Sequence, residues 1–156
     1  MKGAIANVTG AGTWELDMPE SRVALDGSFA GAVSGTGDIT VADAANLPSL
    51  AASFSGTAEV TGGNLSFTYA NGAFTPALVA ANADLSFPAA STVSISVGGA
   101  KLPLGDHVLV QGKTLAGLTD LTFVHDVRGG RVAKLVRTGD ALILRIAPRG
   151  MTISFR

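Results

Sequence analysis

The chain has 156 residues, enough for one domain with a hydrophobic core of its own. Apolar residues make up 47% of the sequence, but aromatic residues are only 6% and charged residues 15%, against about a quarter charged in an average domain. With 20 glycines and so little charge, Ser, Thr, Asn and Gly must cover much of the surface. This is typical of extracellular β-rich proteins and unusual for a cytosolic enzyme. The sequence has no cysteine, which excludes disulfides, thiol catalysis and Cys-ligated metals.

The charges are divided unevenly along the chain. Residues 1–100 hold two basic and eight acidic side chains, a net charge of −6, whereas residues 101–156 hold nine basic and four acidic ones, a net charge of +5. An acidic body and a basic end could steer two ends together or attract an anionic polymer. The alternative is that solvated strand faces carry whichever charge they tolerate.

Short segments of alternating apolar and polar residues predict β-strands along the whole chain. They are separated by Gly, Asn and Asp, the residues that tight turns need. Asn71-Gly72 is among the strongest short turn signals, and the alternating runs on either side of Gly139-Asp140 predict an antiparallel hairpin. The expected strands lie at residues 22–26, 39–41, 59–61, 65–69, 85–87, 92–97, 107–111, 132–137, 141–146 and 151–155.

An internal repeat indicates how these strands could be arranged. The tripeptide Leu-Ser-Phe at 65–67 recurs at 85–87, and Phe54 recurs as Phe74 at the same spacing. Such a period is expected of a solenoid, in which each coil stacks on the previous one. Two chance matches in a low-complexity sequence are the alternative explanation.

We therefore predict an all-β protein: a short parallel β-solenoid (β-helix) with a C-terminal antiparallel hairpin cap. The body would comprise residues 1–97 and the cap residues 98–156, continuous with each other as one domain. The alternative fold is a β-sandwich. The two folds differ at Phe67 and Phe87, which in the solenoid would stack on adjacent coils about 4.8 Å apart.

The C-terminal third also resembles a known family. Residues 102–110 (LPLGDHVLV), 115–118 (LAGL) and 139–146 (GDALILRI) look like the C-terminal segment of bacterial autotransporter-associated β-strand repeat proteins. The resemblance departs from the family pattern at His107, where an aromatic residue is usual. It implies a passenger-like β-helix from a large surface or secreted protein. Its motifs are turn and strand signals, so they say little about activity.

The histidines do not belong to a recognisable reactive pattern. His125 precedes Asp126 and His107 follows Asp106, but a catalytic triad also needs a nucleophile, and the sequence has no Gly-x-Ser-x-Gly or His-Glu-x-x-His motif. We interpret both histidines as exposed turn residues. The aspartates beside glycines are interpreted as turn formers, with calcium at stacked turns as the alternative. We expect no cofactor, no metal and no enzymatic activity.

Two sets of residues are candidates for binding. Trp14 is flanked by Glu15, Asp17 and Glu20, and an aromatic ring beside carboxylates can form a platform for a glycan; the alternative is that Trp14 caps the core. The second set is basic, and we expect it to form a rim of charge that keeps an edge strand from pairing. Nucleic acid is not expected, because stacking aromatics are not interleaved with these charges. The basic set comprises Arg128, Arg131, Lys134, Arg137, Arg145 and Arg149.

These features predict a structural role. We expect a non-enzymatic, self-assembling module of a bacterial surface or secreted protein, such as a fibre or adhesin stalk, that associates through open β edges. A carbohydrate-binding module or weakly glycan-active enzyme is the alternative. No stretch reaches the roughly 18 apolar residues of a transmembrane helix. Met1-Lys2-Gly3 is not followed by the apolar segment of a signal peptide, which leaves either a cytosolic protein or a mature or excised piece. We expect the second, because the sequence starts in the middle of its strand pattern.

Overall fold

The computed structural model describes residues 6–8, 13–16, 22–25, 32–44 and 50–150. Within these ranges the protein is all-β, with fifteen strands in sheets of eight, four and three strands. The strands are β1 (Ala6–Val8), β2 (Thr13–Leu16), β3 (Arg22–Leu25), β4 (Ala32–Gly35), β5 (Asp38–Val41), β6 (Leu50–Phe54), β7 (Thr57–Val60), β8 (Asn64–Ala70), β9 (Ala73–Thr75), β10 (Leu78–Ser86), β11 (Ala90–Ser96), β12 (Gly105–Ala116), β13 (Asp120–His125), β14 (Arg131–Arg137) and β15 (Ala141–Pro148).

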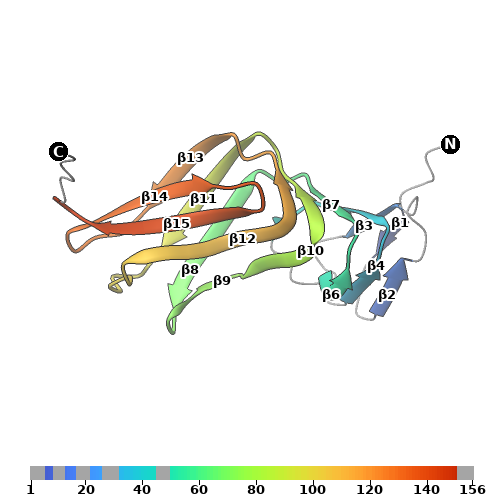
Figure 1. The fold of residues 1–156 in the computed structure, drawn as a ribbon, viewed down its shortest axis with the longest axis horizontal. Coiled ribbons are helices and arrows are strands. Elements are labelled where there is room, and N and C mark those ends of the chain that lie inside the picture. The colour runs from blue at the N-terminus through green and yellow to red at the C-terminus, as the bar shows by residue number, and fades with distance from the viewer. Residues whose placement is uncertain (1–5, 9–12, 17–21, 26–31, 45–49, 151–156) are drawn as a thin grey trace, which may run out of the picture.

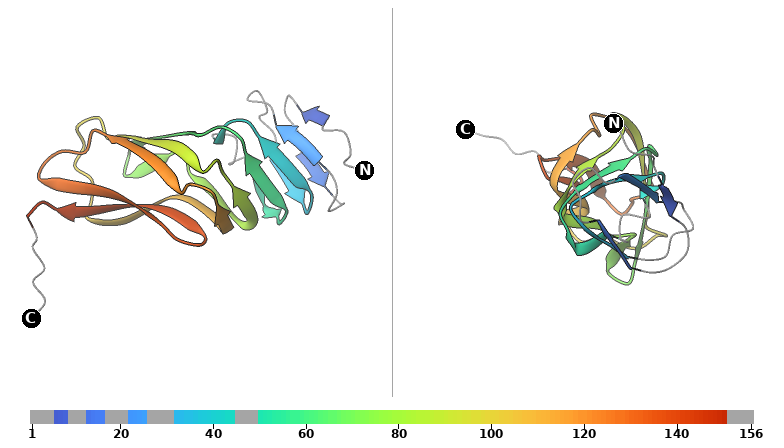
Figure 2. Two further views of the ribbon diagram at one scale, coloured as in Figure 1. Left: turned by 90° about the horizontal axis from the view of Figure 1, so that it is seen from above. Right: turned by 90° about the vertical axis from the view of Figure 1, so that its right-hand side faces the viewer.

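The molecule is elongated, with β1 and β2 at one end and the β14–β15 hairpin at the other (Figure 1). The eight-stranded sheet has the order β1-β3-β5-β7-β10-β12-β15-β14 and runs the length of the molecule. The three-stranded sheet (β2-β4-β6) and the four-stranded sheet (β13-β11-β8-β9) pack against it around one interior (Figure 2). The arrangement is sandwich-like, and none of the sheets closes on itself in the ranges given above.

Most neighbouring strands are parallel and lie two or three elements apart in the chain. Ala6 on β1 lies opposite Val23 on β3, and Ala90 on β11 lies opposite Asp120 on β13. The second pair of partners is separated by a clearly longer stretch of chain than the first. Among the described strands, antiparallel pairing is confined to β8–β9, β12–β15 and β14–β15. The spacing between paired strands therefore widens from the N-terminal to the C-terminal half.

The predicted stacking of Phe67 on Phe87 is wrong. Phe67 lies on β8 of the four-stranded sheet, opposite Ile95 of β11. Phe87 directly follows β10, which belongs to the eight-stranded sheet. The internal repeat thus relates segments of different sheets, because a Leu-x-Phe pattern fits any strand that buries one face and does not specify which strand it pairs with.

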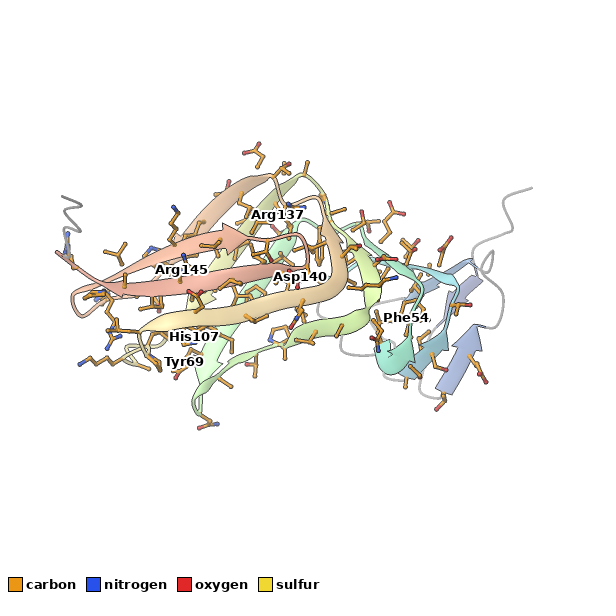
Figure 3. The ribbon with its side chains drawn as sticks, in the orientation of Figure 1. Phe54, Tyr69, His107, Arg137, Asp140 and Arg145 are labelled. Atoms are coloured by element: carbon orange, nitrogen blue, oxygen red, sulfur yellow. The ribbon has the colours of Figure 1, made fainter. Side chains whose placement is uncertain are left out.

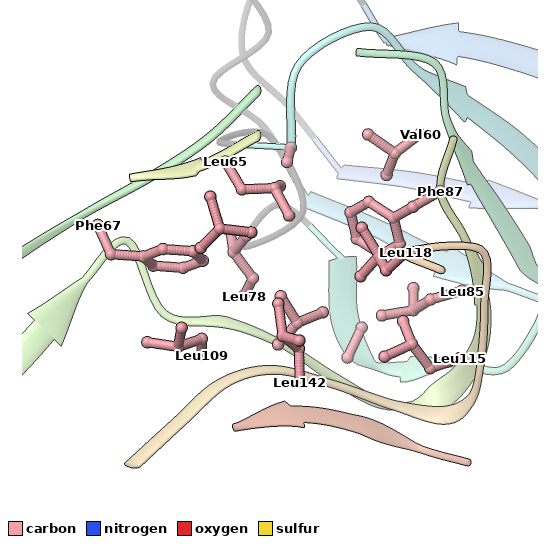
Figure 4. Packing of buried hydrophobic residues seen from close by; sticks show 14 of the residues in the cluster. Val60, Leu65, Phe67, Leu78, Leu85, Phe87, Leu109, Leu115, Leu118 and Leu142 are labelled. Atoms are coloured by element: carbon pink, nitrogen blue, oxygen red, sulfur yellow. The ribbon is translucent and has the colours of Figure 1, made fainter. Parts of the chain in front are cut away.

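The core follows the alternation expected of strands with one buried face. The faces predicted for two strands are confirmed: Val93, Ile95 and Val97 are buried, and so are Leu142, Leu144 and Ile146, whereas Arg145 between the last two is exposed. Figure 4 shows how the layers meet, with the side chains of Leu65 and Phe67 on the four-stranded sheet facing those of Leu109 and Leu142 on the eight-stranded sheet. Burial of this face, at about 25 cal/mol per Å² of apolar surface, is the main stabilising contribution.

The predicted turn at Asn71-Gly72 and the predicted hairpin around Gly139-Asp140 are confirmed, and the structure makes the first turn the tip of a β8–β9 hairpin. Asn71 and Gly72 both have a positive φ, 53° and 84°, as the tight turn between β8 and β9 requires. The chain after 139–140 returns antiparallel, so that Arg137 on β14 lies opposite Leu142 on β15. The strands β12 and β13 still pair in parallel with β10 and β11, and the boundary at residues 97 and 98 stays a prediction.

Candidate interaction surfaces

The predicted glycan cluster lies partly on β2, an edge strand of the three-stranded sheet. Trp14 is opposite Val33 and Glu15 is opposite Ser34, both on β4. Glu15 is exposed. Asp17 and Glu20 lie outside the described residues, so the joint presentation of Trp14 and three carboxylates stays a prediction.

The predicted basic rim does not form a single row. Lys134 and Arg145 lie opposite each other on β14 and β15 and are both exposed. Arg131 and Arg137 belong to the other face of β14, because alternate residues of a strand share a face. That face also holds Ala133 and Leu135, which pack against the core. The strand alternation therefore divides the set between two faces. Arg128 lies in the β13–β14 loop, and Arg149 follows β15.

Three of these arginines are tied into the fold or partly buried. Arg145, labelled on β15 in Figure 3, forms an ion pair with Asp106, with Nε donating to Oδ1 at 2.7 Å. Its hydrogen bond lowers the pKa of Asp106 and raises the pKa of Arg145 itself. Arg137 Nη2 donates to the Leu115 carbonyl at 2.6 Å. Arg131 keeps Nη1 buried with no hydrogen-bond partner in the described part of the chain.

The histidines are placed differently from the prediction. His107 lies within β12 and His125 ends β13, so neither is a turn residue. His107 packs edge-on against Phe74, with ring centroids 5.7 Å apart, and its Nε2 lies 3.0 Å from the Pro103 carbonyl oxygen. His125 packs against Phe123, with centroids 4.8 Å apart. The described residues contain no group of three or more His, Asp or Glu that could hold a metal ion.

Asp126 is engaged by the backbone rather than by a catalytic partner. Its Oδ1 accepts the Val97 N–H at 2.7 Å and its Oδ2 accepts the Ser96 hydroxyl at 3.4 Å. The Val97 hydrogen bond holds the pKa of this carboxyl below its ordinary value of 3.8. Asp126 thus fastens the β13–β14 loop to the end of β11. This role could not be predicted from the sequence, because the two segments are far apart along the chain.

The outer face of the four-stranded sheet presents neutral hydrogen-bonding groups in register. Open hollows of about 370 and 240 Å³ lie along it. Ser and Thr side chains on parallel strands recur about every 4.7–4.9 Å across such a sheet. The polar positions in register are Asn64, Thr92 and Thr122 in one row and Ser66 and Ser94 in the next, which ends at the apolar Val124.

A separate hollow, at the end of the molecule where β14 begins and β15 ends, carries positive charge. It has a volume of about 240 Å³ and lies between the turn after β11 and the β13–β14 loop. Lys101 lines it from the first segment and Arg128 from the second. Lys101 was not among the predicted basic residues, and the only signal in the sequence is the Gly-Gly pair close to each cation, at 98–99 and 129–130.

Comparison with known proteins finds no matching family model, no matching curated protein and no matching solved structure. The resemblance to autotransporter-associated repeat proteins stays a prediction. Within the ranges that the structure describes, no helix has the length and hydropathy needed to cross a bilayer.

Proposed function

We propose that this chain is a non-enzymatic structural module of a bacterial surface or secreted protein. In this proposal it is a short parallel β-solenoid with an antiparallel hairpin cap, and it self-associates through open β edges. One observation carries the proposal: parallel backbone pairing continues from sheet to sheet through the corners of the chain.

The corner hydrogen bonds join each segment to the one stacked beside it. Ser55 N–H donates to the Gly35 carbonyl at 2.8 Å, and Thr61 N–H donates to the Val41 carbonyl at 2.9 Å. The same length of chain separates the partners in both bonds, as in successive positions of one coil. Leu118 N–H donates to the Pro88 carbonyl at 3.2 Å, across a longer stretch of chain. In a sandwich of two independent sheets, the turns between strands do not have to hydrogen-bond to one another. In a solenoid they do so regularly, because each coil stacks on the next along its whole length.

The two ends differ in how their edges are covered. The last described strands at one end, β1 and β2, are parallel members of their sheets and are not folded back into a hairpin. At the other end β14 carries Arg131, Lys134 and Arg137. Basic side chains discourage strand addition, and an edge without them can pair with another chain. We place self-association at the β1–β2 end, and the resemblance supports a surface or secreted setting.

Light scattering coupled to size exclusion tests the proposal. We expect the mass to rise with protein concentration, and we expect the double variant Asn7→Lys/Thr13→Lys to stay monomeric, because it places lysines on both edge strands. The matched control Thr61→Lys/Ser66→Lys adds the same charge at exposed positions away from any edge strand. A monomeric mass for the wild-type protein at all concentrations, or equal association of the two double variants, contradicts the proposal.

A further inference from the structure

The hollow between Lys101 and Arg128 is built from two glycine-containing segments. Its other lining residues are Val97, Gly99, Ala100 and Gly129. Ala100 N–H donates to the Val97 carbonyl at 2.8 Å, which closes one wall as a tight turn. The Asp126 carboxylate fixes the same turn from the side of the second segment. The two walls are therefore held at a defined separation.

The glycines leave the backbone of both walls uncovered. Gly98 and Gly99 have φ values of 54° and 80°, and Gly129 and Gly130 have values of 77° and 71°. No heavy atom lies within 4 Å of the position that a Cβ would take at any of the four. The Gly98 and Ala100 N–H groups are already donated, to the Asp126 carboxylate and the Val97 carbonyl. The Gly99 amide and the amides of the second wall are the backbone donors that can favour an anion there.

The charges at this end are unbalanced. Of the two nearby carboxylates, Asp106 is ion-paired with Arg145, whereas Asp126 accepts hydrogen bonds from the neutral Val97 N–H and Ser96 hydroxyl and so keeps its negative charge. Lys101 and Arg128 are exposed, and neither forms an ion pair with a described residue. Arg131, with its unpartnered Nη1, follows shortly after Gly129 and adds positive potential. Lys101, Arg128 and Arg131 outnumber this one unpaired carboxylate, so the net potential at the hollow is positive.

We propose that this hollow binds a tetrahedral oxyanion, a phosphate or sulfate group, between Lys101 and Arg128. The guanidinium can offer two parallel N–H groups to two oxygens of the anion, and the ammonium supplies a compact charge from the opposite wall. The volume of about 240 Å³ exceeds several-fold the ~30 Å³ share of a water molecule in the liquid. The hollow thus admits the anionic group of a larger ligand, such as a sulfated or phosphorylated polymer.

An NMR titration with inorganic phosphate at constant ionic strength tests the proposal. We expect saturable shifts of the Gly99, Ala100 and Gly129 amides, and a roughly tenfold weaker affinity in Arg128→Gln and in Lys101→Gln, because each loses a charge-assisted contact. The matched control is Lys134→Gln, which removes one exposed charge from β14 outside the hollow. Its affinity should stay within about twofold of the wild-type value.

Two further arms fix the chemistry of the ligand. Sulfate should compete with phosphate for the same amides, and acetate should bind at least roughly tenfold more weakly because it carries one charge and two oxygens. Shifts that grow linearly without saturation, an affinity of Arg128→Gln equal to that of Lys134→Gln, or acetate binding as tight as phosphate binding would each overturn the proposal. The dispersion of the spectra reports directly whether each variant is folded.

Discussion

Asp106 and Arg145 stand opposite each other on β12 and β15, where the eight-stranded sheet changes from parallel to antiparallel pairing. Arg145 donates to both carboxylate oxygens, from Nε at 2.7 Å and from Nη2 at 2.8 Å. Such two-point geometry is the most directional that an ion pair offers. It marks the register at the junction between the parallel strands and the hairpin.

We expect this pair to contribute only a little to stability, because water screens the attraction between the two charges. The side chain of Arg145 is 53% exposed and that of Asp106 is 44% exposed. Asp106→Asn and Arg145→Gln should each lower the free energy of unfolding slightly, and the double variant should lose less than the two single losses combined. Urea unfolding at low and high salt measures this. If the two single losses of unfolding free energy add up to the loss of the double variant, or if high salt leaves these losses unchanged, the two charges do not stabilise the fold through their mutual attraction.

The pH dependence of stability should carry a contribution from Asp126. Because the Val97 N–H lowers the pKa of this carboxyl in the folded state, the folded form releases its proton more readily than the unfolded chain does. The stabilisation is therefore fully present above the ordinary pKa of 3.8 and is lost as the pH falls through the lowered, folded-state pKa. The difference in unfolding free energy between wild type and Asp126→Ala should shrink on acidification through this window.

Asp120→Ala serves as the control for that series, since Asp120 is exposed on the edge strand β13. A series of denaturant melts from strongly acidic to neutral pH compares the two variants with the wild-type protein. If Asp126→Ala and Asp120→Ala follow the same pH profile, the carboxylate at 126 does not clamp the end of β11.

The sequence predicts the local features of this fold well and its long-range pairing poorly. The hairpin turn at Asn71-Gly72 is legible because its positive φ values demand these residue types. The register of the strands cannot be predicted in the same way. The stretch of chain between paired strands lengthens from β1–β3 to β11–β13, so the described strands follow no constant period. The repeat between Phe67 and Phe87 reflects only that both strands bury alternate residues.

The candidate surfaces show the same contrast: local strand patterns are predictable from the sequence, and contacts between distant segments are not. The alternation of strand faces divides the basic residues, so that Lys134 is exposed while Arg131 shares the face of Leu135, which packs against the core. Lys101 and Arg128 are separated along the chain by β12 and β13, and they line one hollow only because neighbouring segments stack. A pattern along the chain cannot indicate such a pair without the register, and the register depends on packing.

The core prediction concerns Phe67, whose side chain is 1% exposed between the two layers. Phe67→Ala should lower the free energy of unfolding by about 3–5 kcal/mol, because it removes buried apolar surface and leaves a cavity. Val79→Ala, at a strand position that is 46% exposed, should change it by less than about 1 kcal/mol. Urea titrations followed by circular dichroism give both values, and similar losses for the two variants would contradict the assignment of the core.

The corner between β12 and β13 should tolerate no side chain at Gly117. This glycine has a φ of 80°, and a Cβ there would lie 1.9 Å from the Phe87 carbonyl oxygen, a backbone atom of the neighbouring segment that cannot move aside alone. Gly72, at a φ of 84° with open space beside it, is the matched control. Gly72→Ala should cost about 1–2 kcal/mol for its backbone conformation. Gly117→Ala should cost about 3 kcal/mol or more, since the overlap adds to the same backbone penalty. Denaturant unfolding measures the difference, and equal losses would mean that the two corners are not stacked as closely as Leu118 and Pro88 indicate.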